Sequence, residues 1–172
     1  MSSFDNNKGP VLAFFCNWAP YRCLLDLGKS GRSLPRPVHY IKVMCSGRMD
    51  PSILLYAFEK GVEGVMVIGC KDKECRYGPG PQQMKIMEER MRGLMGVLGL
   101  EPERFSAMNY APPDTDRLFM DLSSFVKRID KLQKSPLALH PHSDPPPSMG
   151  REKFSGRSSS PSPGGRGLGG GG

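Results

Sequence analysis

The chain has 172 residues, a formal net charge of +7 at neutral pH, and 38% hydrophobic residues. This length suits one ordinary domain with a real core rather than two domains. The positive charge favours acidic partners, but we expect no nucleic-acid binding, because no basic run is interleaved with aromatic residues. No stretch approaches the roughly 18 apolar residues that a membrane span needs, so we expect no membrane insertion and a cytoplasmic location.

Two units in the first third of the chain each join an apolar strand to a helix. Residues 11–15 form a short apolar run, and a helix is expected over 20–28, with a proline in its first turn and a glycine at its end. Residues 38–44 predict a second strand. The Asp-Pro pair that follows favours a helix over residues 50–61, with the aspartate as its N-cap.

The next two units repeat this order. Residues 64–69 are an unbroken apolar run, typical of a strand buried on both faces, and a helix is expected over 82–98. Residues 105–110 predict a fourth strand, and an amphipathic helix follows over 114–132. Strands that alternate with helices indicate an α/β fold. We expect a single open, mainly parallel four-stranded sheet with flanking helices, of the flavodoxin or Rossmann kind.

The composition divides the chain into three parts. We expect a flexible N-terminus over residues 1–9, an α/β domain over residues 10–134 and a disordered tail over residues 135–172. The tail consists almost entirely of Pro, Ser, Gly, His and scattered charge. Such a composition cannot bury enough apolar surface to offset the entropy of ordering.

Four of the five cysteines follow the ends of predicted strands. Cys16 follows the first strand, Cys45 the second and Cys70 the third, and Cys75 lies in the loop beyond Cys70. Because binding sites of open parallel sheets gather at the carboxyl ends of the strands, we expect these thiols to meet at one edge. In a reducing compartment, cysteines indicate metal binding or thiol chemistry rather than disulfides.

Four thiolates can hold a 2Fe–2S cluster, a 4Fe–4S cluster or a zinc ion. Four residues separate Cys70 from Cys75, a spacing also found in plant-type ferredoxins, and no Cys-x-x-Cys pair of the zinc kind is present. We therefore expect a redox cluster in preference to zinc. The fifth thiol, Cys23, is either an alternate ligand or a small buried side chain, and Cys16 is favoured because it leaves the strand directly.

Three segments around these cysteines carry a family resemblance. They are Phe15-Cys16-Asn17-Trp18, Val43-Met44-Cys45-Ser46-Gly47-Arg48 with Asp50-Pro51, and Gly69-Cys70 with Cys75 and Tyr77. At these residues the sequence resembles the hydrogenase iron–sulfur subunit family, whose type member is the delta subunit of methyl-viologen-reducing hydrogenase. The resemblance covers roughly residues 10–132.

The resemblance implies one 2Fe–2S cluster on Cys16, Cys45, Cys70 and Cys75, and no catalytic residue. It implies electron transport in anaerobic metabolism, as part of an oxidoreductase complex. Electrons would pass from a hydrogenase or formate dehydrogenase to the flavoprotein subunit of a heterodisulfide-reductase-type complex. In one departure, the family has a second cysteine where this sequence has Ala19. Cys23 then becomes the alternate ligand.

Two other functions fit the same residues. The chain could be a thiol enzyme, with Cys45 or Cys70 as a nucleophile whose pKa is lowered by a helix N-terminus. Against this, none of His39, His140 and His142 is well placed as a base. The other alternative is a docking subunit that binds zinc or holds no cluster.

Overall fold

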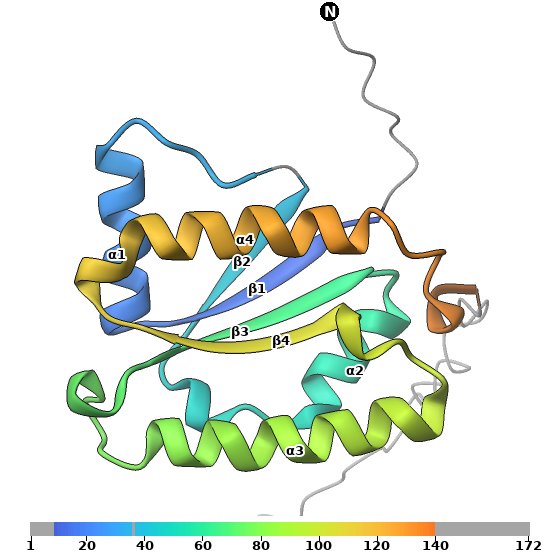
Figure 1. Ribbon diagram of the computed structural model, residues 1–172. Helices are drawn as coiled ribbons and strands as arrows, with labels where there is room; N and C mark the ends of the chain where they lie inside the picture. The colour runs from blue at the N-terminus through green and yellow to red at the C-terminus, as the bar shows by residue number, and fades with distance from the viewer. Residues whose placement is uncertain (1–8, 36, 140–172) are drawn as a thin grey trace, which may run out of the picture. The chain divides into compact units, whose positions relative to one another are not determined.

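The computed structural model describes residues 9–35 and 37–139. They form a four-stranded, all-parallel sheet with helices on both faces, which confirms the predicted α/β class (Figure 1). The strands are β1 (Val11–Cys16), β2 (Val38–Val43), β3 (Gly64–Cys70) and β4 (Phe105–Tyr110), and the helices are α1 (Ala19–Lys29), α2 (Pro51–Glu59), α3 (Gly80–Leu98) and α4 (Thr115–Ile129).

The strand order β2-β1-β3-β4 contains one reversal, and this reversal positions the site. From β1 the chain moves outward to β2, and it then crosses back to place β3 on the other side of β1. Phe15 of β1 is paired with Ile68 of β3, so the two strands end side by side. The point where the strand order reverses is where open α/β sheets form their binding crevice. Cys16 ends β1 and Cys70 ends β3 at this point.

Each face of the sheet has its own core. Helices α1 and α4 cover one face, and α2 and α3 cover the other (Figure 1). Neighbouring side chains of a strand point to opposite faces, so Phe14 packs with α2 and α3 whereas Phe15 packs with α1 and α4. On α3 the buried stripe consists of Met84, Met87, Met91 and Met95, at the predicted helical spacing.

Capping residues explain where the helices begin and end. The carboxylate of Asp50 accepts a hydrogen bond of 2.8 Å from the N–H of Ser52, as expected of the N-cap of α2. Helix α3 begins at Gly80, two residues before the predicted start, because Pro81 is tolerated in a first helical turn. The helix ends at Gly99, which has a φ of +67°. Glycine adopts this left-handed conformation readily and therefore often ends helices.

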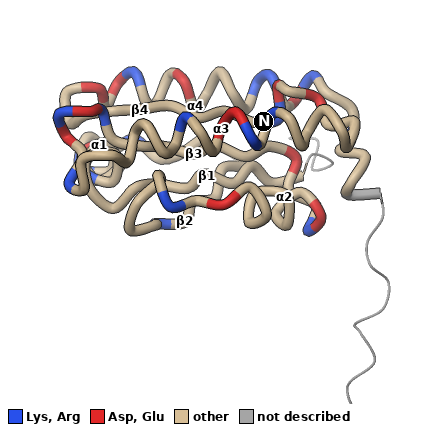
Figure 2. Tube along the Cα trace, turned by 90° about the horizontal axis from the view of Figure 1, so that it is seen from below, with Lys and Arg blue, Asp and Glu red and all other residues tan. Residues whose placement is uncertain are grey.

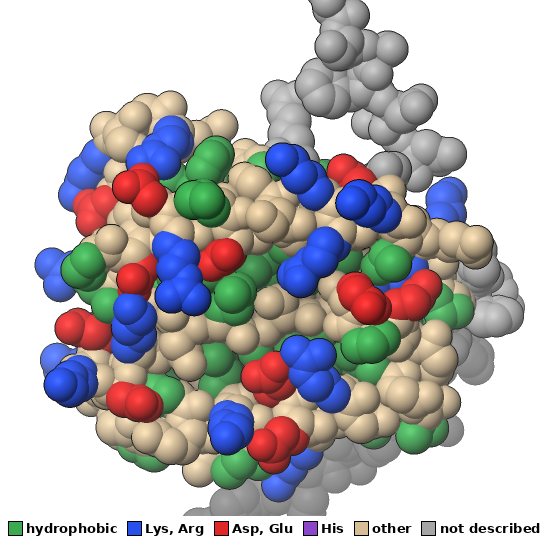
Figure 3. Space-filling model, in the orientation of Figure 1, with side chains coloured by type: hydrophobic (Ala, Val, Ile, Leu, Met, Phe, Trp, Pro, Cys, Tyr) green, Lys and Arg blue, Asp and Glu red, His purple; other side chains and the backbone are tan. Residues whose placement is uncertain are grey.

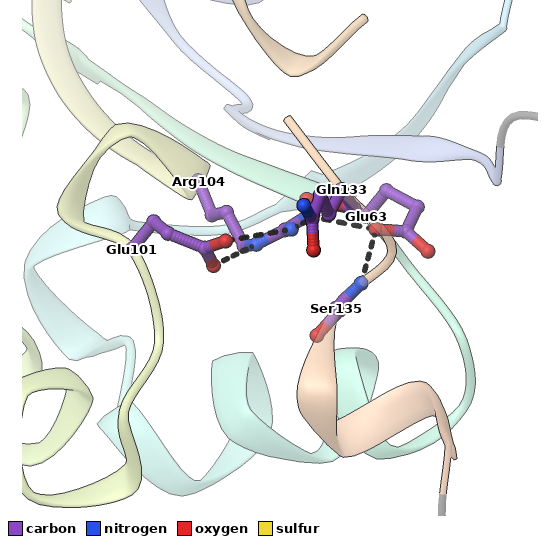
Figure 4. Close-up of polar contacts among 5 residues, drawn as sticks. All are labelled: Glu63, Glu101, Arg104, Gln133 and Ser135. Atoms are coloured by element: carbon purple, nitrogen blue, oxygen red, sulfur yellow. Dashed lines mark hydrogen bonds and ion pairs between the residues drawn. The ribbon is translucent and has the colours of Figure 1, made fainter. Parts of the chain in front are cut away.

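A buried arginine ties the last described segment to the sheet (Figure 4). Arg104 is fully buried, and it donates hydrogen bonds to the carboxylates of Glu63 and Glu101 at 2.7 and 2.6 Å. It also donates to the carbonyl of Gln133, and Glu63 accepts a bond of 2.8 Å from the N–H of Ser135.

These bonds carry the described fold past residue 134, the expected end of the domain. Pro136–Leu139 form a short 3₁₀ turn, and Leu137 packs against the core under α2 and α3. Residues 1–8 and 140–172 lie outside the described residues, and with them most of the predicted flexible N-terminus and disordered tail.

Basic and acidic residues are interspersed along the chain trace in Figure 2. On the face shown in Figure 3 they are interspersed with apolar side chains, so the net positive charge does not gather into one patch there. Among the helices of residues 9–35 and 37–139, none is both long and apolar enough to cross a membrane.

Candidate metal centre

Two thiols lie side by side at the reversal of the strand order. The Sγ atoms of Cys16 and Cys70 are 3.5 Å apart, and both residues are almost completely buried. All five cysteines of the described chain are free thiols. The close pair follows from topology, because adjacent parallel strands that end at the same level bring their last residues together.

A second pair of thiols flanks the first turn of α3. A methyl group added at Gly80 would lie 2.7 Å from Sγ of Cys75 and 3.4 Å from Sγ of Cys45. Cys75 also packs against the group formed by Cys16 and Cys70. Thiols that are distant in sequence therefore gather at one edge of the sheet, where the four strand-end cysteines were expected to meet.

Glycines let the segments of this edge approach one another closely. A Cβ atom at Gly47 would lie 2.6 Å from the carbonyl oxygen of Gly80, so the turn after β2 touches the start of α3 through backbone alone. At Gly69, a Cβ atom would lie 2.8 Å from Oγ of Ser46. Real Cβ atoms do not make such contacts, so a larger side chain at either position would force its neighbours to shift.

The pKa values of the two buried thiols, Cys16 and Cys70, are shifted in opposite directions. A hydrogen bond from the Cys70 thiol lowers the pKa of Cys16 to about 6, against the opposing effect of burial. The backbone N–H groups of Trp18 and Ser46 lower this pKa further. The same thiol pairing raises the pKa of Cys70, and burial adds to this effect. One thiolate therefore forms readily in this pair, and a thiolate is the form that binds metals.

The fifth cysteine lies elsewhere. Cys23 is fully buried in the core under α1 and α4, where its thiol donates a bond of 3.0 Å to the carbonyl of Ala111. Burial raises its pKa. Ala19, by contrast, is packed with Cys16 and Cys70 at the site. Of the two residues discussed for the missing family cysteine, the structure brings Ala19 to the thiols and leaves Cys23 in the core.

Aromatic and basic side chains cover the outer side of the thiol group. Trp18 packs against it, the Arg76 guanidinium lies 4.8 Å from the centre of the indole ring, and the Tyr77 ring meets the indole edge-on at 6.1 Å. A cavity of about 300 Å³ lies beside Cys75, and Lys73 is among its lining residues. This surface carries more positive than negative charge, which suits a buried anionic centre.

The thiols lie near one another but do not enclose a single metal ion. Within the described chain, no three His, Cys, Asp or Glu side chains converge closely enough to surround a single metal ion. In a tetrahedral site with metal–sulfur bonds of about 2.3 Å, neighbouring sulfurs lie about 3.8 Å apart. The Cys16–Cys70 separation of 3.5 Å is close to that value.

The glycines between the thiols were not among the residues predicted from the sequence. The sequence predicts a helix that begins at residue 82, whereas Gly80 already lies in the first turn of α3, next to two sulfurs. The signal that could have revealed it was Pro81, since proline is common in a first helical turn. For Gly47, no local signal exists, because its close contact is with a residue far away in sequence.

The fold and the site define a class: parallel α/β domains that gather cysteine thiols at the switch point of the sheet. Within this class, residues 11–133 match the family described as methyl-viologen-reducing hydrogenase, delta subunit. The chain belongs to this family, and the family predicted from the sequence is confirmed.

Individual relatives are of two kinds. The chain is 31% identical over 129 residues to a vhu iron-sulfur subunit of the F420-non-reducing hydrogenase of Methanocaldococcus jannaschii, covering 74% of this chain and 96% of the relative. The corresponding protein of Methanopyrus kandleri is 31% identical over 134 residues, with 77% and 99% covered. One subunit of the ferredoxin:CoB-CoM heterodisulfide reductase of Methanosarcina mazei is 31% identical over 122 residues, 71% of this chain. The match spans only 15% of that longer protein.

Proposed function

We propose that this protein is an electron-transfer subunit that holds one 2Fe–2S cluster on Cys16, Cys45, Cys70 and Cys75. The observation that carries the proposal is the gathering of thiols at the switch point of the sheet, where Cys16 lies beside Cys70 and the thiols of Cys75 and Cys45 lie next to Gly80. Relatives that span nearly the same length are iron–sulfur subunits by name, which supports a cluster of this kind.

The residues around the thiols suit such a group. When bound, a 2Fe–2S cluster supplies one-electron redox chemistry. Cys16 and Cys70 are shielded from water by burial, and the N–H groups of Trp18 and Ser46 stabilise the thiolate of Cys16. The N-terminus of α3 lies at the second pair, and the partial positive charge of this helix end favours negative charge there.

Exposure suggests the side on which electrons enter and leave. Of the four proposed ligands, Cys75 is the one that is partly exposed, and basic side chains line the cavity beside it. We propose that a partner protein approaches this side. Since the module also matches part of a heterodisulfide reductase, we propose a flavoprotein of that type as one partner, and a hydrogenase or formate dehydrogenase as the other.

Anaerobic purification of the full chain tests the proposal. We expect a brown protein with about two iron and two sulfide per chain, and an EPR signal after reduction with dithionite. A series of Cys→Ser variants then tests the ligands. Replacement of Cys16, Cys45, Cys70 or Cys75 should abolish the cluster or change its spectrum. Cys23→Ser is the matched control and should keep both, because the hydroxyl can still donate to the carbonyl of Ala111.

Three results would contradict this function. Stoichiometric zinc without sulfide would indicate a zinc-binding protein, and a chain free of metal would indicate a docking role only. Turnover of a thiol-reactive substrate by the metal-free protein would indicate a thiol enzyme. The structure gives little support to a thiol enzyme with a histidine base, because His39, the one histidine in the described segments, is an exposed residue on β2.

A further inference from the structure

Trp18, the only tryptophan of the chain, carries a polar group without a partner at the thiol site. The residue lies between Cys16 and the start of α1, and its side chain packs against the group formed by Cys16, Ala19 and Cys70. The Nε1 atom of the indole is inaccessible to solvent and has no hydrogen-bond partner among the residues that the structure describes.

A buried donor of this kind calls for an acceptor. Leaving an N–H group buried and unpaired is unfavourable, and a buried tryptophan N–H usually finds a partner. Arg76 and Tyr77 hold the ring from its face and its edge. Arg76 cannot serve as the acceptor, because a guanidinium group has only donors. The two neighbours therefore fix the indole without satisfying its N–H.

We propose that the Trp18 N–H donates a hydrogen bond to a sulfur of the bound cluster, either a ligand thiolate or an inorganic sulfide. This inference rests on the proposed function. Trp18 would then be a positioning residue that tunes the centre. Reduction adds negative charge to the sulfurs, so a hydrogen bond to them favours the reduced state and raises the reduction potential.

The experiment removes the N–H group and measures the reduction potential. Trp18→Phe keeps an aromatic ring but has no donor. Because the chain has a single tryptophan, expression of the full chain in a tryptophan auxotroph supplied with benzothienylalanine alters only position 18, and replaces the N–H by sulfur at nearly constant shape. Tyr77→Phe, which keeps its ring against the indole, is the control.

We expect equal iron and sulfide contents in the wild type, the benzothienylalanine protein and the Tyr77→Phe variant. The reduction equilibrium should shift about tenfold toward the oxidised state in both proteins that lack the indole N–H, which is about 59 mV for a one-electron couple. Electron–nuclear double resonance of the reduced wild type should detect one proton that exchanges in D2O in addition to those of the backbone N–H groups, and this additional coupling should be missing from the same two proteins.

Two outcomes separate this inference from the proposed function. A wild-type protein without iron and sulfide would overturn both. A wild type with a full cluster, whose potential and additional exchangeable proton coupling persist in the benzothienylalanine protein, would overturn the role of Trp18 alone. If Trp18→Phe loses its cluster, the nearly isosteric replacement still decides the question.

Discussion

Gly80 controls how closely two of the thiols can lie. It has no side chain, and the space that a methyl group would occupy is taken by the sulfur of Cys75, with the sulfur of Cys45 next to it. The thiol site therefore depends on the lack of a Cβ atom at residue 80 as well as on the cysteines themselves. Residues that bind nothing can therefore be as important to the centre as the cysteines.

This yields a prediction for Gly80→Ala. The added Cβ atom would lie 2.7 Å from Sγ of Cys75, so the sulfur must move and the cluster should be lost or reduced to a small fraction of the wild-type content. Iron and sulfide analysis of the anaerobically purified variant measures the effect. Gly96→Ala, in the same helix with open space around its Cβ position, should keep the full content. Equal contents in both variants would show that Gly80 has no such role.

At the scale of elements, helix α3 has a continuous buried stripe, but some of its exposed positions hold residues of low helix propensity. Its four buried methionines face the sheet at helical spacing, whereas Gly93 and Gly96 lie on the exposed side. Glycine in a helix interior is less stable than alanine by about 0.5–1 kcal/mol. The helix is therefore held by its packing more than by its intrinsic propensity.

We predict that Gly93→Ala and Gly96→Ala each raise the free energy of unfolding by about 0.5–1 kcal/mol, because nothing lies within 4 Å of either Cβ position. Urea titrations followed by circular dichroism measure the change. The two effects should add, since neither new methyl group has a tertiary contact. A loss of stability in either single variant would contradict the open surroundings of these positions.

At the scale of the whole molecule, Arg104 joins three separate parts of the chain. Its guanidinium binds Glu63 before β3, Glu101 before β4 and the carbonyl of Gln133 after α4 (Figure 4). A buried pair of charges is strongly destabilised when one partner is removed, because the other charge is left without compensation. The network therefore closes the end of the sheet opposite to the thiols.

Arg104→Met should lower the free energy of unfolding by about 3–5 kcal/mol, because it leaves the carboxylate of Glu63 buried and unpaired. Lys29→Met is the matched control. Lys29 pairs with Asp26 on the surface, and removal of such a pair changes stability by less than about 1 kcal/mol. Denaturant unfolding of both variants makes the comparison. Similar losses of stability in the two variants would show that the buried ion pair of Arg104 stabilises the fold no more than an exposed pair does.

The same network predicts a dependence on pH. The hydrogen bond from Arg104 holds the pKa of Glu101 below its ordinary value of 4.5. The folded state therefore binds this proton less tightly than the unfolded state does. The resulting stabilisation is complete above about pH 4.5 and is lost as the pH falls through the lower pKa of the folded state.

Urea titrations between neutral pH and about pH 3 test this dependence. We expect stability to fall more steeply with acidity in the wild type than in Glu101→Gln, which has no proton to take up at this position. Parallel pH profiles for the two proteins would contradict the coupling between Glu101 and Arg104.

Local patterns in the sequence were enough to predict the elements and the fold class. Apolar runs marked the four strands, and the Asp-Pro pair marked the start of α2, because these signals lie within a few residues of one another. The prediction that thiols meet also followed from a rule about parallel sheets rather than from any contact. The exposure of β2 was not predictable, since an edge position depends on strand order.

The sequence by itself determined the alternation of strands and helices, the family, and the cysteines that follow the strands. Only the tertiary structure decided that Cys16 pairs with Cys70, that Cys45 and Cys75 meet at Gly80, and that Cys23 lies in the core. The physical reason is distance along the chain. Propensity, capping and periodicity act between near neighbours, whereas these contacts depend on the strand order and on close backbone approach between remote segments.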